Sequence, residues 1–507
     1  MSCANNTVVI SGLHPDATTD GSPSGCPVDC AAKGQACSFG RCTSSACASA
    51  ELTSNTPVGC LFYTLQADNV TADEAAGTTF LITSQGPDPA NVELQQWTSD
   101  GGPPAWTAIA TASIAGGGAS ARLPISAAEV TATGLSPQAA LRISSDRPVT
   151  VAEVESDDLT VPATSSGGTM ILPLQALGTD YRAVAYRQQT SPDVENALGS
   201  RGGAARVIVV GTHADTQVTL TPGGAAPDAG ASTVVLGDGD VYQIYTGAEG
   251  EDLTGMHISS SGAPVAVFSG NISTSYGSQV VGINSADMAY EQMPPVPAWS
   301  TSYVAAALTP QQSIGCTSFF GAAGGSLWRV VAAKDGTVVT LSGPAIGPST
   351  TKIPLDAGAS ESFVEVGSFA VDANLPVLVT QGIDCEPSLS LAIAVGGGAQ
   401  LYKDLPFAVP PGFDLLLGIV RHTGAEVDLD GVDLGDAPFE AVSADYEVAA
   451  VPLAACAPTD GSGVCTHRLQ SMLGVGMSLR GMDVRSSYVL TAPVLIRCDP
   501  MTGSCLS

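Results

Sequence analysis

The sequence predicts an all-β protein in which four tandem antiparallel units of about 115 residues follow a small disulfide-rich leader. Three observations support this fold class. The 507 residues include 57 Gly and 34 Pro, and only 5% are aromatic, which argues against a helical protein. A Pro-Val strand pattern recurs along the chain, and seven of the thirteen cysteines lie in the first sixty residues.

The main repeat is a polar turn followed by proline and a valine-rich run. Its prolines, Pro148, Pro264, Pro376 and Pro493, are 116, 112 and 117 residues apart. Proline suits the start of a strand, because its fixed φ fits extended backbone and its missing N–H does least harm there. We therefore expect each proline to open a strand. The four copies of the element are residues 141–156, 256–271, 368–383 and 484–499.

Two further elements recur between the proline strands. The first is a strand, a polar turn and a second strand, a pattern that predicts a hairpin. Its copies are residues 80–94, 207–220, 330–341 and 416–429. The second is a proline-led linker followed by a strand. Its copies are residues 172–186, 293–307 and 405–418.

The proline strands are apolar on both faces. Val265 and Val267 share one face at the two-residue period of a strand, while Ala266 and Phe268 occupy the other. Six or seven such strands per unit predict a β-sandwich of about 100 residues. Two assemblies fit the repeat, a row of sandwiches or a propeller-like ring. The expected boundaries are 1–60 for the leader and 61–160, 172–272, 293–384 and 404–499 for the units.

The leader has too few apolar residues to fold without covalent support. Its closely spaced cysteines predict disulfides, since the C-x2-C pairs and His partners of a zinc site are missing. These cysteines are Cys26, Cys30, Cys37, Cys42, Cys47 and Cys60. We expect them to pair among themselves, with the connectivity left open. Cys3 is the expected unpaired thiol, and a lipid anchor on it stays an open alternative.

The six late cysteines predict local loops. We expect Cys456 to pair with Cys465 and Cys498 with Cys505, and a longer bridge could join Cys316 to Cys385. Disulfides are typical of an oxidising compartment, so the sequence favours an extracellular or cell-surface protein. No apolar signal segment is visible after Met1.

The charge of the chain excludes several partners. It carries 48 acidic residues against 18 Lys and Arg, a formal net charge of −30 at pH 7. Nucleic acid and anionic membrane surfaces both require clustered basic residues, so neither is an expected partner. No apolar run reaches 18 residues, and we expect no transmembrane helix.

Candidate sites are few. Asp428, Asp430, Asp433 and Asp436 lie in one short segment and are a weak candidate for calcium, which prefers such hard oxygen ligands. An exposed acidic hairpin is the alternative interpretation, and no other cofactor is expected. Four tryptophans could either stack on a sugar or pack units together; they are Trp97, Trp106, Trp299 and Trp328. No nucleophile or phosphate-binding motif is present.

The segment DMAYEQMPPVPAWSTSY at residues 287–303, after PVAVFSGN at residues 264–271, resembles the N-terminal domain family of IgGFc-binding protein. That family has a PVAVFSG strand before an acidic EQLPP linker. Ser300 stands where the family usually has Gly, and a common Cys-Asp-His is replaced by Ala286-Asp287-Met288. The resemblance covers about residues 60–500 and implies a secreted or surface-associated protein without catalytic residues. It does not by itself imply Fc binding.

These observations predict a non-enzymatic binding or adhesion protein on a β-repeat scaffold, with an unidentified protein or glycan as ligand. Two alternatives stay open. One is a carbohydrate-active enzyme with paired carboxylates in a cleft, and the other is a purely structural surface or fibre component. The sequence leaves the oligomeric state undetermined.

Overall fold

The computed structural model describes 17 segments of the chain: residue 30 and residues 35–38, 41–53, 56–69, 78–98, 105–125, 127–155, 166–188, 203–223, 230–274, 287–308, 325–347, 351–383, 388–396, 399–458, 463–483 and 486–493. Within them the protein is nearly all β, as the sequence predicts. None of the helices in the described segments is long and apolar enough to cross a membrane.

The leader is a two-stranded hairpin and one helix held by disulfides. β1 (Ala36–Ser38) pairs antiparallel with β2 (Arg41–Thr43), and α1 (Ser45–Thr53) follows. Disulfides join Cys30 to Cys42 and Cys47 to Cys60. The second of these disulfides joins α1 to β3 (Gly59–Thr64), the first strand after the leader.

Four units with a similar order of strands follow the leader. Unit 1 comprises β3 (Gly59–Thr64), β4 (Thr78–Ser84), β5 (Ala90–Thr98), β6 (Ala105–Ile114), β7 (Ser120–Pro124), β8 (Gly134–Ser136), β9 (Leu141–Glu155) and β10 (Gly167–Ile171). Unit 2, preceded by η2 (Leu174–Ala176), comprises β11 (Asp180–Arg182), β12 (Ala205–Gly211), β13 (Thr216–Thr221), β14 (Ser232–Leu236), β15 (Val241–Tyr245), β16 (His257–Ser260), β17 (Val265–Thr274) and β18 (Asp287–Gln292).

Units 3 and 4 repeat the pattern. Unit 3, preceded by η4 (Val296–Ala298), comprises β19 (Ser300–Ala305), β20 (Ser326–Ala332), β21 (Thr337–Ser342), β22 (Thr351–Leu355), β23 (Ser360–Glu365), β24 (Phe369–Ile383), β25 (Ser388–Leu391) and β26 (Ile393–Ala394). Unit 4 comprises β27 (Tyr402–Val409), β28 (Asp414–His422), β29 (Asp428–Leu429), β30 (Val432–Asp433), β31 (Glu440–Ala441), β32 (Tyr446–Leu453), β33 (Cys465–Asp483) and β34 (Ser486–Thr491).

One long strand organises each unit. In unit 1 the first half of β9 pairs with β3 and β5, and its second half pairs with β4 and β10. The strand therefore belongs to both sheets of a sandwich. β24 and β33 do the same in units 3 and 4, whereas in unit 2 the corresponding strand is split into β16 and β17. The shared connectivity is the structural form of the repeat.

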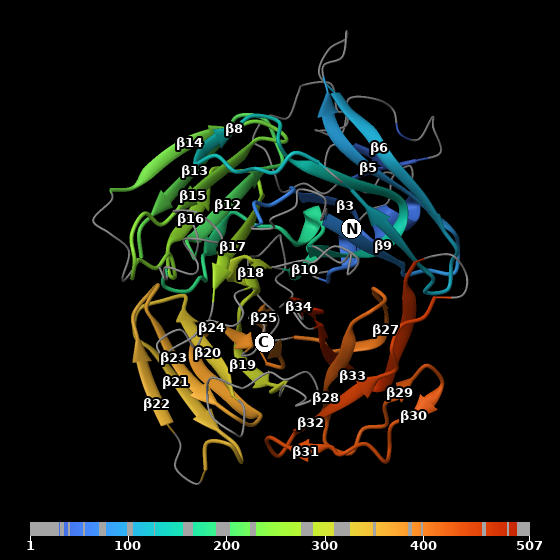
Figure 1. Cartoon of the computed structure of the whole chain (residues 1–507), viewed down its shortest axis with the longest axis vertical. Coiled ribbons are helices and arrows are strands. Elements are labelled where there is room, and N and C mark those ends of the chain that lie inside the picture. The colour runs from blue at the N-terminus through green and yellow to red at the C-terminus, as the bar shows by residue number, and fades with distance from the viewer. Residues whose placement is uncertain are drawn as a thin grey trace, which may run out of the picture.

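The four sandwiches are arranged in a ring (Figure 1). In each unit the strand that follows the long strand and pairs with it lies at the centre, and we call β10, β18, β25 and β34 the axial strands. β10 contacts β18 and β34, and β25 contacts the same two strands, so the ring is closed. Both predicted assemblies are thus partly right, because the units are sandwiches and they form a ring. The pairing also places β10, β18 and β25 beyond residues 160, 272 and 384, the expected ends of units 1 to 3.

The predicted hairpins are wrong. β4 and β5 do not pair with each other, and neither do their counterparts β12 and β13. Each of the two strands pairs with a different half of the long strand, so the polar turn between them crosses from one sheet to the other. A strand-turn-strand pattern in sequence does not distinguish this crossing from a hairpin, since both need the same turn residues.

The positions of the prolines are confirmed only in part. Pro264 directly precedes β17, but Pro148 and Pro376 lie inside β9 and β24, because the long strand runs through both sheets. Pro493 follows β34, so the fourth copy was aligned wrongly. Val475 pairs with Arg421 as Val265 pairs with Gly211, and Gly474, with φ of 92°, precedes it. The fourth unit therefore uses glycine where unit 2 uses proline.

The apolar cores lie inside the sandwiches and between them. Val265 and Val267 are completely buried in a cluster that also includes Val331 and Leu378 of unit 3. Cys456 and Cys465 form a disulfide in unit 4, at the loop where the sequence predicts one. Cys3, Cys26, Cys316, Cys385, Cys498 and Cys505 lie outside the described residues.

Candidate functional site

The four aspartates predicted as a calcium candidate lie around the β29–β30 turn. Asp428 and Asp433 face each other across the two strands, and their carboxylates accept hydrogen bonds from the backbone N–H of Gly431 and Gly435. Asp430 has a φ of 56°, and its carboxylate accepts hydrogen bonds from His467 Nδ1 at 2.7 Å and from the Arg468 N–H. These carboxylates act as turn acceptors. No group of three or more His, Cys, Asp or Glu able to hold an ion occurs within the described residues, so calcium stays a prediction.

A pair of carboxylates that the sequence analysis did not select lies between units 1 and 2. Glu153 and Glu155 alternate on β9 and are both fully buried. The hydroxyl of Thr64 donates to Glu153, and the hydroxyl of Thr78 donates to Glu155 at 2.8 Å. The amide of Gln66 also donates to Glu155, at 3.4 Å.

Unit 2 supplies a cation and an aromatic ring to the same place. The Arg206 guanidinium lies 4.9 Å from the ring centre of Tyr290 and donates to the carbonyl oxygen of Asp68 at 2.5 Å. Burial raises the pKa of Glu155 to about 7 and holds the pKa of Glu153 well above its ordinary value, with the Glu155 charge as the second cause for Glu153. Burial also raises the pKa of the Tyr290 hydroxyl.

The residues that carry the family resemblance hold the axial strands together. The backbone N–H of Gln292 and the carboxylate of Glu291 both bond to the hydroxyl of Thr169 on β10, at 2.9 and 2.8 Å. The side-chain oxygen of Gln292 accepts the N–H of Leu172. Gly168 allows the close approach of β34, since a Cβ there would lie 3.0 Å from Tyr488 Cβ. The motif therefore joins β18 to β10, which belong to the sheets of two different units.

The junction of units 2 and 3 contains a buried ion pair. Arg329 Nη1 lies 2.9 Å from Asp252 Oδ2, and the guanidinium also donates to the hydroxyl of Thr254 and packs on Tyr186. Trp299 is 1% exposed and belongs to the apolar cluster that units 2 and 3 share. Its Nε1 donates to the Pro294 carbonyl at 3.0 Å. Trp299 thus packs units together.

Two of the other tryptophans face each other across the β5–β6 hairpin, at the end of β5 and the start of β6. Trp97 and Trp106 are half-buried and meet edge to face at 5.2 Å between ring centres. Trp106 Nε1 donates to Asp238 of unit 2 at 2.9 Å, and Arg142 lies over its ring. Trp106 is therefore committed to a contact between units, which leaves less of the pair available for a sugar.

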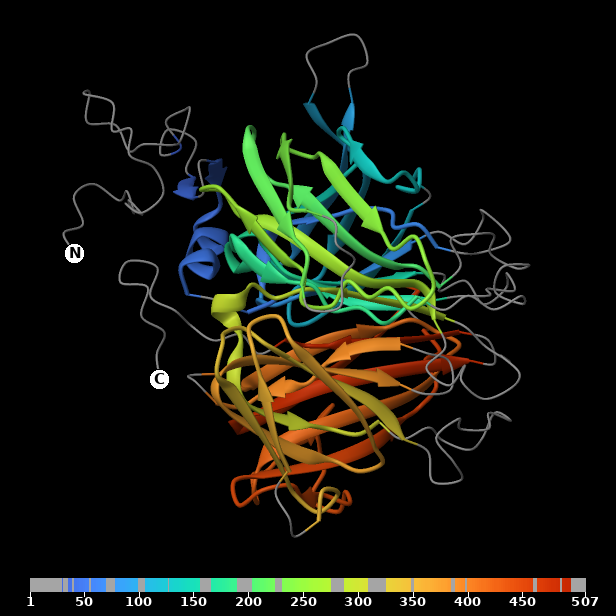
Figure 2. The ribbon, with the colours of Figure 1, turned by 90° about the vertical axis from the view of Figure 1, so that its left-hand side faces the viewer.

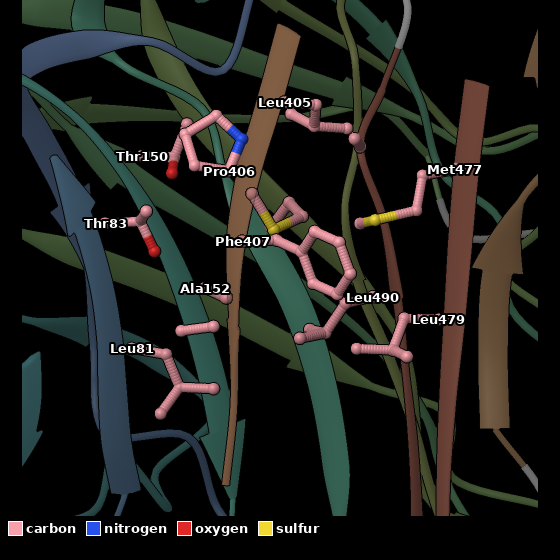
Figure 3. A pocket seen from close by; sticks show the side chains of 13 residues that line it. Leu81, Thr83, Thr150, Ala152, Leu405, Pro406, Phe407, Met477, Leu479 and Leu490 are labelled. Atoms are coloured by element: carbon pink, nitrogen blue, oxygen red, sulfur yellow. The ribbon is translucent and has the colours of Figure 1, made fainter. Parts of the chain in front are cut away.

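A small apolar cavity lies where unit 4 closes on unit 1 (Figure 3). Leu81 and Ala152 line it from unit 1, and Phe407, Leu479 and Leu490 line it from unit 4. Its volume of about 20 Å³ accommodates one water molecule and no substrate. The buried carboxylates Glu153 and Glu155 are not among its lining residues.

The sequence analysis missed Glu153, Arg206 and Arg329 for a common reason. Each gains its partner from a segment distant in sequence: 89 residues separate Glu153 from Thr64, 138 separate Arg206 from Asp68, and 77 separate Arg329 from Asp252. No short motif marks such residues. These charged residues alternate with valine along their strands. The alternation indicates that both faces of the strand are buried, but it does not identify the partner of the charged side chain.

The fold and these polar clusters define a class of protein, a ring of β-sandwiches whose buried charges join neighbouring units. Residues 167–481 match the family described as IgGFc binding protein, and the chain belongs to that family. No curated protein matches the chain. A solved structure, the cryo-EM structure of arabinofuranosyltransferase AftD from Mycobacteria, is 9% identical with a TM-score of 0.13. That match covers 82% of this chain and 42% of the transferase.

Proposed function

We propose that the chain is a secreted or cell-surface binding protein without catalytic activity, which uses the ring as a rigid scaffold for a protein or glycan ligand. The observation that carries the proposal is the family match over residues 167–481, since the family is one of binding proteins. A closed ring suits this role, because strands joined through a common centre hold the outer loops in fixed positions.

The disulfides support the extracellular location. Cys30–Cys42, Cys47–Cys60 and Cys456–Cys465 are distributed over the leader, unit 1 and unit 4. Such bonds persist in oxidising compartments and are rare where glutathione keeps thiols reduced.

The geometry of the carboxylate pair does not favour the glycosidase alternative. A glycosidase places two carboxylates on either side of a sugar in an open cleft, about 5–9 Å apart. Glu153 and Glu155 are instead fully buried on one strand and hydrogen-bonded to threonine hydroxyls. Because both side chains are completely enclosed, they do not face a substrate.

Binding measurements on the purified, oxidised full chain test the proposal. The immobilised chain would be exposed to an immunoglobulin G Fc fragment, a panel of extracellular proteins and a glycan array, with heat-denatured chain as control. We expect saturable binding to at least one probe, with no turnover of the bound glycans. Hydrolysis of a glycan that disappears in Glu153→Gln would contradict the non-enzymatic function.

A further inference from the structure

β6 (Ala105–Ile114) is an open edge of the molecule. Among the described strands it pairs only with β5, although it also contacts β7. It has ten residues, and a strand of that length spans about 33 Å. Figure 2 shows the hairpin of β5 and β6 projecting beyond the rest of unit 1.

The sequence of β6 lacks the usual protection of an edge strand. It reads AWTAIATASI and contains no charge and no proline. Thr107, Ala108 and Thr111 are exposed. Ile109, which a bulge leaves without a partner on β5, is 45% exposed. Natural proteins protect long edges with lysine, proline or short length, because an unprotected edge pairs with other chains.

The corresponding edges of the other units are protected. β22 carries Lys352 and Pro354, and β30 has two residues, one of them Asp433. β14 is uncharged like β6 but is only five residues long. Within the described residues β6 is therefore the longest of these four edges, and it has no protecting residue.

The molecule already extends one sheet with a strand from a neighbouring unit. β8 of unit 1 pairs antiparallel with β15, the edge strand of one sheet of unit 2, through Gly134, Leu135 and Ser136. The same backbone pairing is available to β6, provided that another strand reaches it.

We propose that β6 of one chain pairs antiparallel with β6 of a second copy, forming a two-fold dimer. A two-fold interface must be complementary to itself, and an uncharged strand meets that condition. A formal net charge of −30 makes most other surfaces repel between copies, whereas β6 places no like charges opposite each other. The dimer is independent of the proposed ligand binding and goes beyond it.

Multi-angle light scattering on the full chain over a range of concentrations tests the dimer. We expect the mass to rise from 50.8 kDa to twice that value as the concentration increases. Salt should strengthen the association, because it screens the repulsion between two acidic copies. A chain that stays monomeric at all concentrations in both 0.15 M and 1 M salt would overturn the proposal.

Variants locate the interface. The pair Ile109→Lys and Thr111→Lys places charges on exposed positions of β6 and should weaken dimerisation at least tenfold. The matched control is Val235→Lys on β14, which is 54% exposed and should leave the dimer unchanged. The opposite pattern, in which only the control dissociates the dimer, would move the interface to β14 and overturn the assignment.

Amide exchange gives a readout that does not depend on a variant folding. In the wild-type chain, exchange of β6 amides should slow as protein concentration rises, while exchange in β22 stays constant. A dimer that forms without any added protection in β6 would show that another surface holds it.

Discussion

Individual charged residues in this protein act at contacts between units. Arg206 and Arg329 each reach from their own unit to a backbone carbonyl of the preceding unit, and Asp252 completes the second contact. A buried charge is expensive unless it is paired or neutralised, and removing one partner of a buried pair costs more than the pair contributes. Glu155 lies close to Glu153. A proton on the Glu155 carboxylate neutralises its charge, which is the alternative to pairing that charge with a cation.

The first prediction concerns the pH dependence of stability at Glu155. Burial raises its folded-state pKa from 4.5 to about 7. The stabilisation from the neutral form is complete below about pH 4.5 and is lost as pH rises through 7. Between pH 5 and pH 8 the free energy of unfolding should fall by roughly 2 kcal/mol through this residue. Urea denaturation at several pH values measures the change.

Glu155→Gln tests the assignment, because glutamine stays neutral at every pH. The variant should show a flatter pH profile, with a residual slope from Glu153 and Glu291, whose pKa values burial also raises. The matched control is Glu361→Gln on the exposed side of β23, which should keep the wild-type profile. Identical profiles in both variants would remove Glu155 from the explanation.

At the scale of elements, the sequence predicts strands well and their partners poorly. The valine alternation around Val265 correctly indicates a strand covered on both faces, because local pattern reflects burial. The strand-turn-strand copies wrongly predict hairpins, because both strands pair with the long strand, which lies some 60 residues further along the chain. In unit 4, Gly474 stands where the other units have the proline, and Pro493 follows β34 and does not open a strand.

The candidate sites follow the same rule. Cys456 and Cys465 were predictable as a local loop, since nine residues separate them. The contact of Arg206 with the Asp68 carbonyl was not, because it requires two units to be placed side by side. Sequence patterns carry information about the environment of each residue, whereas the ring is defined by contacts that no local pattern encodes.

The second prediction concerns the apolar core around β17 in unit 2. Val267 is completely buried in the cluster shared by units 2 and 3. Val267→Ala removes two methyl groups and should lower the free energy of unfolding by about 1–3 kcal/mol. The matched control is Val235→Ala on β14, where the side chain is 54% exposed and the change should be within about 0.5 kcal/mol. Equal denaturation midpoints for the two variants would contradict a core role for β17.

At the scale of the whole molecule, the ring and the leader are stabilised in different ways. The ring has apolar clusters that cross from unit to unit, and its first and last axial strands meet at the centre (Figure 1). The leader has short strands, one nine-residue helix and few buried apolar residues. Small domains of this kind depend on disulfides, because too little surface is buried to offset the entropy of ordering the chain.

The third prediction is that reduction releases the leader while the ring persists. Cys47–Cys60 joins α1 to β3 and closes a loop of 13 residues, which is worth about 3 kcal/mol in the chain-entropy model. Apart from the disulfide, α1 also contacts β9, and the Ser44 hydroxyl donates to the Asp146 carbonyl at 2.7 Å. Limited proteolysis with and without reductant, followed by mass spectrometry, should show new cleavage within residues 35–53. The double variant Cys47→Ser and Cys60→Ser isolates this bond, because it leaves Cys456–Cys465 intact. A leader that resists protease equally well in the reduced protein and in the double variant would show that packing on β9, and not the disulfide, holds it to the ring.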